Sequence, residues 1–156
     1  METSHAQPSP HGDLDFEVRR VRSAEELRAA VALRYEVFCI EQGVPRSEER
    51  DGRDGDALHL IAVSGNELIG TCRLVFAGGT VQFSRLAVAR EHRRNGVATA
   101  LLKATDDATL EHGAHRIVLH AQTYARPLYD ATGYVARGRQ FTEAGIDHIA
   151  MEKVLA

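Results

Sequence analysis

Apolar and polar positions in the first part of the chain predict a strand and a long helix. Residues 16–21 alternate between the two kinds of side chain, as a half-buried strand does. Ser23, followed by Glu26 three positions later, has the pattern of a capping box, and a helix over 24–40 follows it. The inward stripe of this helix is expected to contain Leu27, Val31, Arg34 and Phe38.

The middle of the chain has the pattern of three strands followed by a helix. Turn residues at 64–67 and 78–79 separate the strands, which are expected over 58–63, 68–76 and 80–89. The helix is expected over 96–112, with Gly113 as its C-cap. Its inward face is expected to carry Val97, Leu101, Thr105 and Ala108.

The remaining elements complete a mixed sheet. A strand over 116–121 follows a helix, so we expect it to lie parallel to the strand before that helix. A short helix over 124–132 and strands over 134–137 and 146–155 come last. The order lacks the repeated βαβ units of a dinucleotide-binding fold. We therefore expect an α+β fold with a mixed, mostly antiparallel sheet and flanking helices.

Composition favours one domain without affinity for nucleic acid or membranes. The chain has 156 residues, 44% of them hydrophobic, and we expect a loose tail over 1–15 and a single domain over 16–156. The formal net charge of −3 argues against nucleic acid and anionic membranes as partners. Cys39 and Cys72 lie in apolar segments and are expected to be reduced, as in a cytoplasmic protein.

The segment 86–102 predicts an anion-binding turn between a strand and a helix. Its centre, Arg93-Arg94-Asn95-Gly96-Val97-Ala98, fits the pattern Arg-x-x-Gly-x-Ala. The first amides of a helix point at one place and carry the positive end of the helix dipole. Gly96 lets a ligand approach the main chain, and the two arginines suit phosphate oxygens. The segment therefore predicts a pyrophosphate site.

The order of elements, with Arg-x-x-Gly-x-Ala after a strand, resembles the GNAT superfamily of N-acetyltransferases. Residues 122–134 are similar to the family's second pattern, Asn-x-x-Ala-x-x-x-Tyr-x-x-x-Gly-Phe. The resemblance implies the GNAT fold, acetyl-CoA as cosubstrate, and a pantetheine arm held by the main chain of Leu86, Ala87 and Val88. The residues implied for the other CoA contacts are Arg93, Arg94, Asn95, Gly96, Val97, Ala98, Thr99 and Gln122.

The same resemblance places Tyr129 beside the thioester sulfur, where a departing thiolate benefits from a proton. An attacking amine must be neutral, so a base is expected, and Glu41, Glu143 and His148 are the candidates. Neither cysteine has the setting of an acyl carrier. We therefore expect direct attack by a primary amine of a small molecule or peptide, in a ternary complex.

A further constellation resembles the ElaA-like subgroup of the GNAT proteins. It comprises Arg34, Glu49, Asp51, Asp54, His59 and Glu143, which we assign to the acceptor side. Arg34 lies on the apolar stripe and should meet an acidic partner, because an unpaired buried charge is costly. The acidic residues could form a structural ion-pair network, an acidic pocket for a cationic amine, or, together with His59 or His148, a metal site. No metal is expected, since the spacing matches neither an EF-hand nor a zinc site.

Two other functions compete with N-acetyl transfer. Arg34 and Phe38, followed by the acidic positions Glu49, Asp51 and Asp54, are also similar to acyl-homoserine-lactone synthases, which use S-adenosylmethionine. A non-catalytic module that binds CoA is the second alternative. Many proteins of this fold pair through late strands, so a homodimer is expected.

Overall fold

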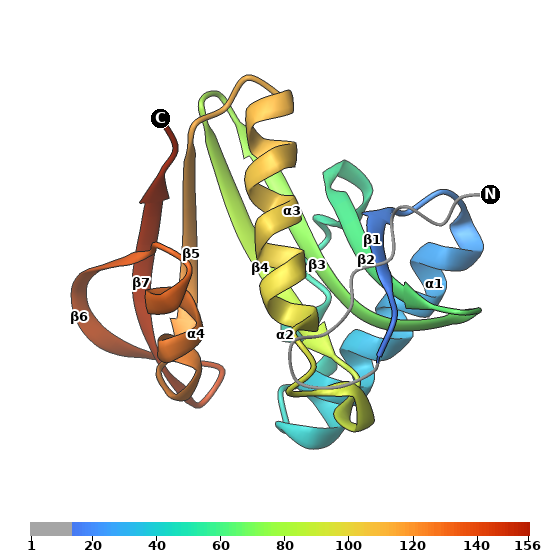
Figure 1. Cartoon of the computed structure of the whole chain (residues 1–156). Helices are drawn as coiled ribbons and strands as arrows, with labels where there is room; N and C mark the ends of the chain where they lie inside the picture. Colours follow the sequence, from blue (N-terminus) through green and yellow to red (C-terminus); the bar gives the residue numbers. More distant parts are fainter. Residues whose placement is uncertain (1–13) are drawn as a thin grey trace.

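The computed structural model describes residues 14–156, which form one twisted seven-stranded sheet with helices on both faces (Figure 1). The strands are β1 (Glu17–Arg20), β2 (Leu58–Ser64), β3 (Glu67–Ala77), β4 (Thr80–Val88), β5 (Arg116–Gln122), β6 (Val135–Glu143) and β7 (Ile146–Val154). Their order in the sheet is β1-β2-β3-β4-β5-β7-β6, and only β4 and β5 are parallel neighbours. The mixed, mostly antiparallel α+β sheet expected from the sequence is confirmed.

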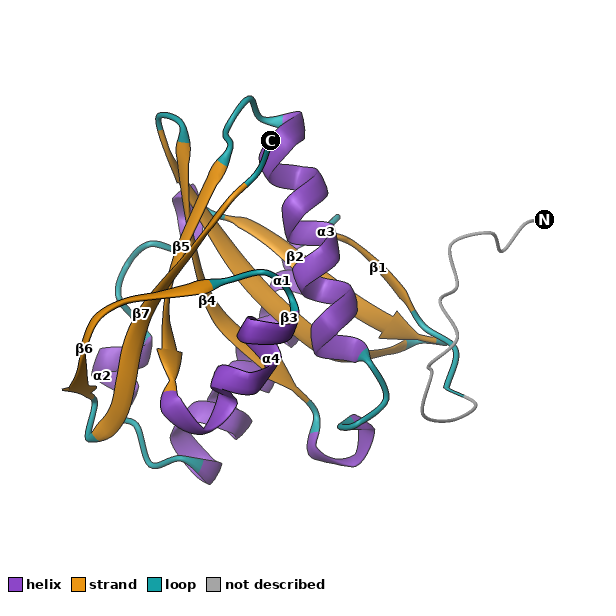
Figure 2. Cartoon of the chain, turned by 60° about the vertical axis from the view of Figure 1, so that its left-hand side comes forward, coloured by secondary structure: helices purple, strands orange, loops and turns teal. Residues whose placement is uncertain are grey.

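The helices cover the two faces of the sheet unequally (Figures 1 and 2). Helices α3 (Val97–Glu111) and α4 (Arg126–Ala131) lie on one face, and α1 (Ala24–Arg34) and α2 (Arg46–Glu49) lie on the other. Helix α1 packs against β3 and β4, near the middle of the sheet.

Helix α3 supplies much of the apolar core. Val97, Leu101, Thr105 and Ala108 are all buried, as the apolar period predicted. Gly96, at the N-cap, has a φ of 81°, a backbone conformation that glycine adopts without strain. No helix of residues 14–156 has the length and apolar character needed to cross a membrane.

The segment predicted as one helix over 24–40 is divided. Helix α1 begins after the Ser23 cap and ends at Arg34, and a π-helix (Tyr35–Glu41) continues it. The amide of Gln42 donates to the carbonyl of Val37, five residues back, at 3.2 Å. The fully buried positions are Ala30, Arg34 and Val37, whereas the predicted Leu27, Val31 and Phe38 are half-buried. The apolar period could not reveal the extra residue in the π-turn.

Two segments differ from the predicted boundaries. The loop predicted over 43–55 contains the short helix α2, and β6 is longer than the predicted 134–137. Strand β6 is an edge strand with mostly exposed side chains, so no apolar alternation marks its full length. Residues 1–13 of the predicted tail lie outside the described residues, while Leu14 packs against the core.

Strands β4 and β5 pair for only a short distance. Their parallel pairing joins residues 80–82 to 116–118, and beyond it the ribbons separate (Figure 1). A register shift between β3 and β4 accompanies the separation, and Arg85 there has a φ of 60°. Ala87 and Val88 pair with β3 on one side, and on the other side residues 86–88 have no strand partner in the described sheet.

Candidate active site

A cleft of about 1000 Å³ opens where β4 and β5 separate. Its wall combines residues from the π-helix, β4, the first turn of α3, α4 and the β6–β7 turn. Most of the site residues predicted from the sequence line it. Those that do not are Arg34, Asp54, His59 and Asn95.

The turn before α3 presents backbone amides to the cleft. Gly96, Val97, Ala98 and Thr99 line it. The N-cap provides no side-chain hydrogen bond, and among residues 14–156 no turn or loop carbonyl accepts from the amides of 97–99. The Asn95 side chain donates to the carbonyls of His92 (3.2 Å) and Arg93 (3.1 Å), which fixes the turn instead of facing the cleft. A helix start with open amides favours an anion.

The two arginines of the turn have different surroundings. Arg93 donates to both carboxylate oxygens of Glu41, at 2.7 and 3.0 Å, and to the carbonyl of Val88 at 2.9 Å. Arg90 adds a third bond to Glu41 at 3.1 Å. Arg94 has a φ of 63° and makes no ion pair within the described chain. Glu41, a predicted base, therefore contacts Arg93, a predicted pyrophosphate ligand.

These contacts change the chemistry of the Glu41 carboxylate. The hydrogen bonds from Arg93, and then from Arg90, lower its pKa in spite of partial burial. A carboxylate held in this way is a weak proton acceptor, because the arginines favour its charged form. The geometry therefore suits an ion pair better than a base at this position.

Tyr129 of α4 also lines the cleft. Its side chain is 7% exposed and packs edge-on against Phe83 and Tyr134, with ring centroids 6.4 and 5.7 Å away. Burial raises its pKa, so the phenol keeps its proton across the physiological range. The hydroxyl can therefore donate a proton or a hydrogen bond to a group in the cleft.

Gln122, at the end of β5, pairs with Gln42. Each side-chain amide donates to the carbonyl oxygen of the other, at 2.8 and 3.3 Å, and Gln42 also donates to the Tyr124 hydroxyl at 3.2 Å. This reciprocal pair connects the end of the π-helix to β5 across the gap beside β4. Gln122 borders the cleft, and its side-chain amide is already engaged by Gln42.

His148 of β7, another predicted base, is buried at the cleft. It is 6% exposed, lines the cleft, and stacks on Phe141 at 5.9 Å. Its Nδ1 lies 2.7 Å from the carbonyl of Ile146, which can only accept. Nδ1 must therefore carry a hydrogen, and in the neutral form of the ring Nε2 holds the lone pair.

Glu143, also predicted at the acceptor side, pairs with a histidine that the sequence analysis missed. Its carboxylate lies 2.9 Å from Nδ1 of His120, and both side chains line the cleft. The His120 ring contacts Phe141 edge-on at 5.0 Å. Only the register of β5, β7 and β6 brings these residues together, so no local sequence pattern could have identified His120.

Arg34 meets the acidic partners that its burial required. Its Nε donates to Glu49 at 2.6 Å and its Nη1 donates to Asp54 at 2.9 Å. The Arg34 and Glu49 side chains are 1% and 3% exposed. Burial is the largest single influence on the pKa of Asp54 and favours its neutral form, but the hydrogen bonds and charges of Arg34 and Arg73 together outweigh it and lower the pKa. His59 Nε2 donates to the carbonyl of Asp54 at 3.0 Å, and His59 does not line the cleft.

Two arginines that the sequence analysis missed complete this network. Arg73 of β3 donates to both oxygens of Asp51, at 2.7 and 2.8 Å, and to Asp54 at 3.0 Å. The hydrogen bonds from Arg73 lower the pKa of Asp51. Arg85 donates to the carbonyls of Glu48 and Glu49 and pairs with the carboxylates of Glu49 and Asp51. Three arginines thus face three carboxylates, which leaves little negative charge for a cation.

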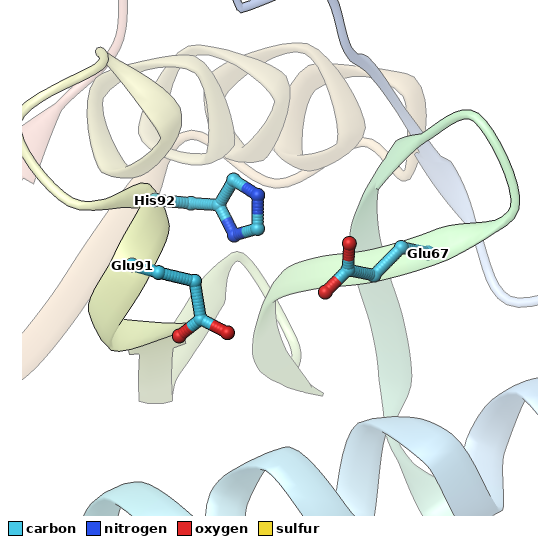
Figure 3. A group of neighbouring side chains, drawn as sticks. All are labelled: Glu67, Glu91 and His92. Atoms are coloured by element: carbon cyan, nitrogen blue, oxygen red, sulfur yellow. The ribbon is translucent and has the colours of Figure 1, made fainter.

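Three residues near the α3 turn form a separate group (Figure 3). Glu91 and His92 face Glu67 of β3, and one potential ligand atom from each lies within 4.8 Å of the others. Both carboxylates are exposed, and exposed acids often gather without an ion. We assign no metal role to this group.

Comparison with known proteins places the chain among acetyltransferases. The profile described as "Acetyltransferase (GNAT) domain" matches residues 19–155. The protein named "Uncharacterized N-acetyltransferase YjcF" of Bacillus subtilis (strain 168) is 35% identical over 133 residues, which cover 85% of this chain and 95% of that protein.

Solved structures agree with this result. An acyl-CoA N-acyltransferase from Pseudomonas aeruginosa has a TM-score of 0.79 and 30% identity, covering 90% of this chain and 100% of that chain. ElaA of Escherichia coli has a TM-score of 0.78 and 24% identity, covering 90% of this chain and 99% of that chain. At that identity the similarity to ElaA concerns the fold alone.

Proposed function

The chain belongs to the GNAT acetyltransferase family, and we propose that it transfers an acetyl group from acetyl-CoA to a primary amine. One observation carries the proposal. The unpaired edge of β4, the open first turn of α3 and the buried Tyr129 phenol border the same cleft. Such a combination suits a long cosubstrate with a phosphate at one end and a reactive thioester at the other.

The residues of the cleft fit acetyl-CoA along its length. Residues 86–88 offer main-chain donors and acceptors to an extended pantetheine arm, as an added strand would use them. The amides of 97–99 and the Arg94 guanidinium offer donors to a pyrophosphate. When bound, acetyl-CoA supplies the activated acetyl group.

We assign proton transfer to His148 and Tyr129. As the amine nitrogen bonds to the thioester carbon, His148 Nε2 accepts the proton that the amine loses. As the carbon–sulfur bond breaks, Tyr129 donates its proton to the sulfur, and the proton on His148 restores the phenol through water. A backbone amide of residues 86–88 can stabilise the developing oxyanion.

Direct attack needs no acyl carrier in the protein. Burial raises the pKa of Cys72 to about 12, so this thiol stays protonated. We prefer His148 as the base because Glu41 is bound by two arginines and Glu143 by His120.

We further propose that the acidic loop is structural and that the chain is ElaA-like. The arginines that hold Glu49, Asp51 and Asp54 support the first statement, because paired carboxylates attract cations weakly. The constellation from Arg34 to His59 supports the second. A cytoplasmic location, where thiols stay reduced, accords with an acetyl-CoA-dependent enzyme.

The test begins with ligand binding. At a hundredfold excess over Kd, acetyl-CoA should stabilise the folded protein by about 2.7 kcal/mol, measured as a rise in Tm. S-adenosylmethionine should not do so. Stabilisation by S-adenosylmethionine alone would replace the proposal with acyl-homoserine-lactone synthesis.

An acceptor screen then tests transfer. Polyamines, amino acids, aminoglycosides and peptide N-termini are offered with acetyl-CoA, and release of free thiol is followed. Replacing His148 with Asn should lower kcat by about 10²-fold and leave CoA affinity unchanged. His115→Asn, a change at an exposed histidine outside the cleft, is the matched control. CoA binding without transfer to any acceptor would favour the non-catalytic module.

A further inference from the structure

The Glu41 carboxylate accepts hydrogen bonds from Arg90 and Arg93, which lie beside the open first turn of α3. It binds Arg93 through both oxygens, at 2.7 and 3.0 Å, and Arg90 through one, at 3.1 Å. A bidentate carboxylate on a guanidinium uses the same planar pair of N–H donors that a phosphate group uses. Glu41 therefore presents to Arg93 the contact that a pyrophosphate would make.

This ion pair can exchange with solvent and with a competing anion. The Arg93 and Glu41 side chains are 38% and 21% exposed, and Arg90 is 74% exposed. Pairs that are open to water hold weakly, because water and salt screen them. The same turn supplies amides 97–99 and the unpaired Arg94, so an incoming pyrophosphate would gain more donors than Glu41 has.

Glu41 also belongs to the segment that borders the other end of the cleft. It is the last residue of the π-helix, and the next residue, Gln42, forms the amide pair with Gln122. Val37 and Phe38, of the same π-helix, line the cleft. Release of Glu41 would therefore remove one of the contacts that hold the segment carrying Val37, Phe38 and Gln42.

We propose that Glu41 is a positioning residue that pairs with Arg93 until the pyrophosphate of CoA takes its place. The inference rests on the proposed function, since it requires CoA in this cleft. In the free protein the carboxylate keeps Arg93 in place and connects the π-helix to the α3 turn. When CoA binds, Arg93 turns its donors to the phosphate and Glu41 leaves, so donor binding alters the wall on which the acceptor is received.

The test measures coenzyme A affinity by titration calorimetry, which needs no acceptor. Glu41→Gln should bind coenzyme A about fivefold more tightly than the wild type, the factor that corresponds to about 1 kcal/mol for an exposed ion pair. Glu91→Gln is the matched control, because Glu91 adjoins Arg90 and has the same charge but no ion pair to the arginines of the turn in the described chain. It should change affinity by less than about twofold.

A double-mutant cycle isolates the pair. In an Arg93→Gln background, which itself weakens binding, Glu41→Gln should no longer tighten it, because the competition has been removed. The proposed exchange would be overturned if Glu41→Gln bound coenzyme A as tightly as the wild type or more weakly. It would also be overturned if Glu41→Gln and Glu91→Gln raised the affinity for coenzyme A equally. If the wild type binds no coenzyme A at all, the proposed function falls, and the exchange falls with it.

Discussion

Replacing Glu49 with Gln tests whether the acidic loop is a structural element. Glu49 is 3% exposed, its carboxylate accepts a hydrogen bond from Arg34 Nε at 2.6 Å, and it forms an ion pair with Arg85, whose Nε lies 3.2 Å away. Gln has the same size but carries no charge, and its NH₂ group cannot accept from a guanidinium. The change therefore leaves Arg34 buried with Asp54 as its remaining carboxylate.

The expected loss follows from burial. Removing one partner of a buried ion pair costs about 3–5 kcal/mol, and we expect about 3 kcal/mol here because Asp54 still contacts Arg34. For a domain of this size that loss corresponds to a fall in Tm of about 6–12 °C. It is a large part of a total stability of about 5–15 kcal/mol.

Urea unfolding followed by circular dichroism measures this change. Glu48→Gln is the control, because Glu48 is the preceding residue of α2 and its exposed side chain makes no ion pair in residues 14–156. The control should stay within about 0.5 kcal/mol of the wild type. Equal stability of Glu49→Gln and the wild type would refute the reasoning. It would favour the alternative in which Glu49 belongs to a pocket for a cationic acceptor amine.

Three further results are expected. Gly70→Ala should lose about 1–3 kcal/mol in urea unfolding, because its Cβ would lie 2.7 Å from Val97 Cγ1, and adding Val97→Ala should recover part of the loss. Tyr129→Phe should lower kcat about 10²-fold with unchanged CoA affinity, and an unchanged kcat would exclude Tyr129 as the acid. Arg73 lowers the pKa of Asp51 in the folded protein. The contribution of Asp51 to the free energy of unfolding is therefore complete above its unfolded pKa of about 4 and is lost as the pH falls below that value. The Tm of Asp51→Asn should therefore depend less on pH than that of the wild type below about pH 4, and parallel curves would contradict this.

Features set by neighbouring residues could be predicted from the sequence. The inward face of α3 followed from apolar residues at helical spacing, and its start followed from a glycine that adopts a positive φ. The need of Arg34 for an acid followed from the cost of burying a charge. The first two inferences used residues close together in the sequence, and the third used the general cost of burying an unpaired charge. None of them needed knowledge of the tertiary structure.

Contacts between distant segments could not be predicted. Arg73 and Arg85 lie on strands and meet the acidic residues only because the loop before β2 folds back across β3 and β4. His120 depends on sheet register in the same way. The pairing of Glu41 with Arg93 joins residues 52 positions apart in the sequence, and an extra residue in the π-helix sets its geometry.

Burial explains why two ion-pair systems of similar chemistry should behave differently. Arg34 and Glu49 are 1% and 3% exposed, so either charge alone would remain in a medium that solvates it poorly, and the pair should persist in every state of the folded protein. Arg93 and Glu41 are 38% and 21% exposed, so water can replace either partner at little cost. The first pair can therefore hold the loop while the second gives way to a ligand. The exposed pair lies beside the first turn of α3, where we propose that the phosphate binds, and the buried pair lies in the loop that we propose to be structural. The exposure of each pair therefore suits its proposed role.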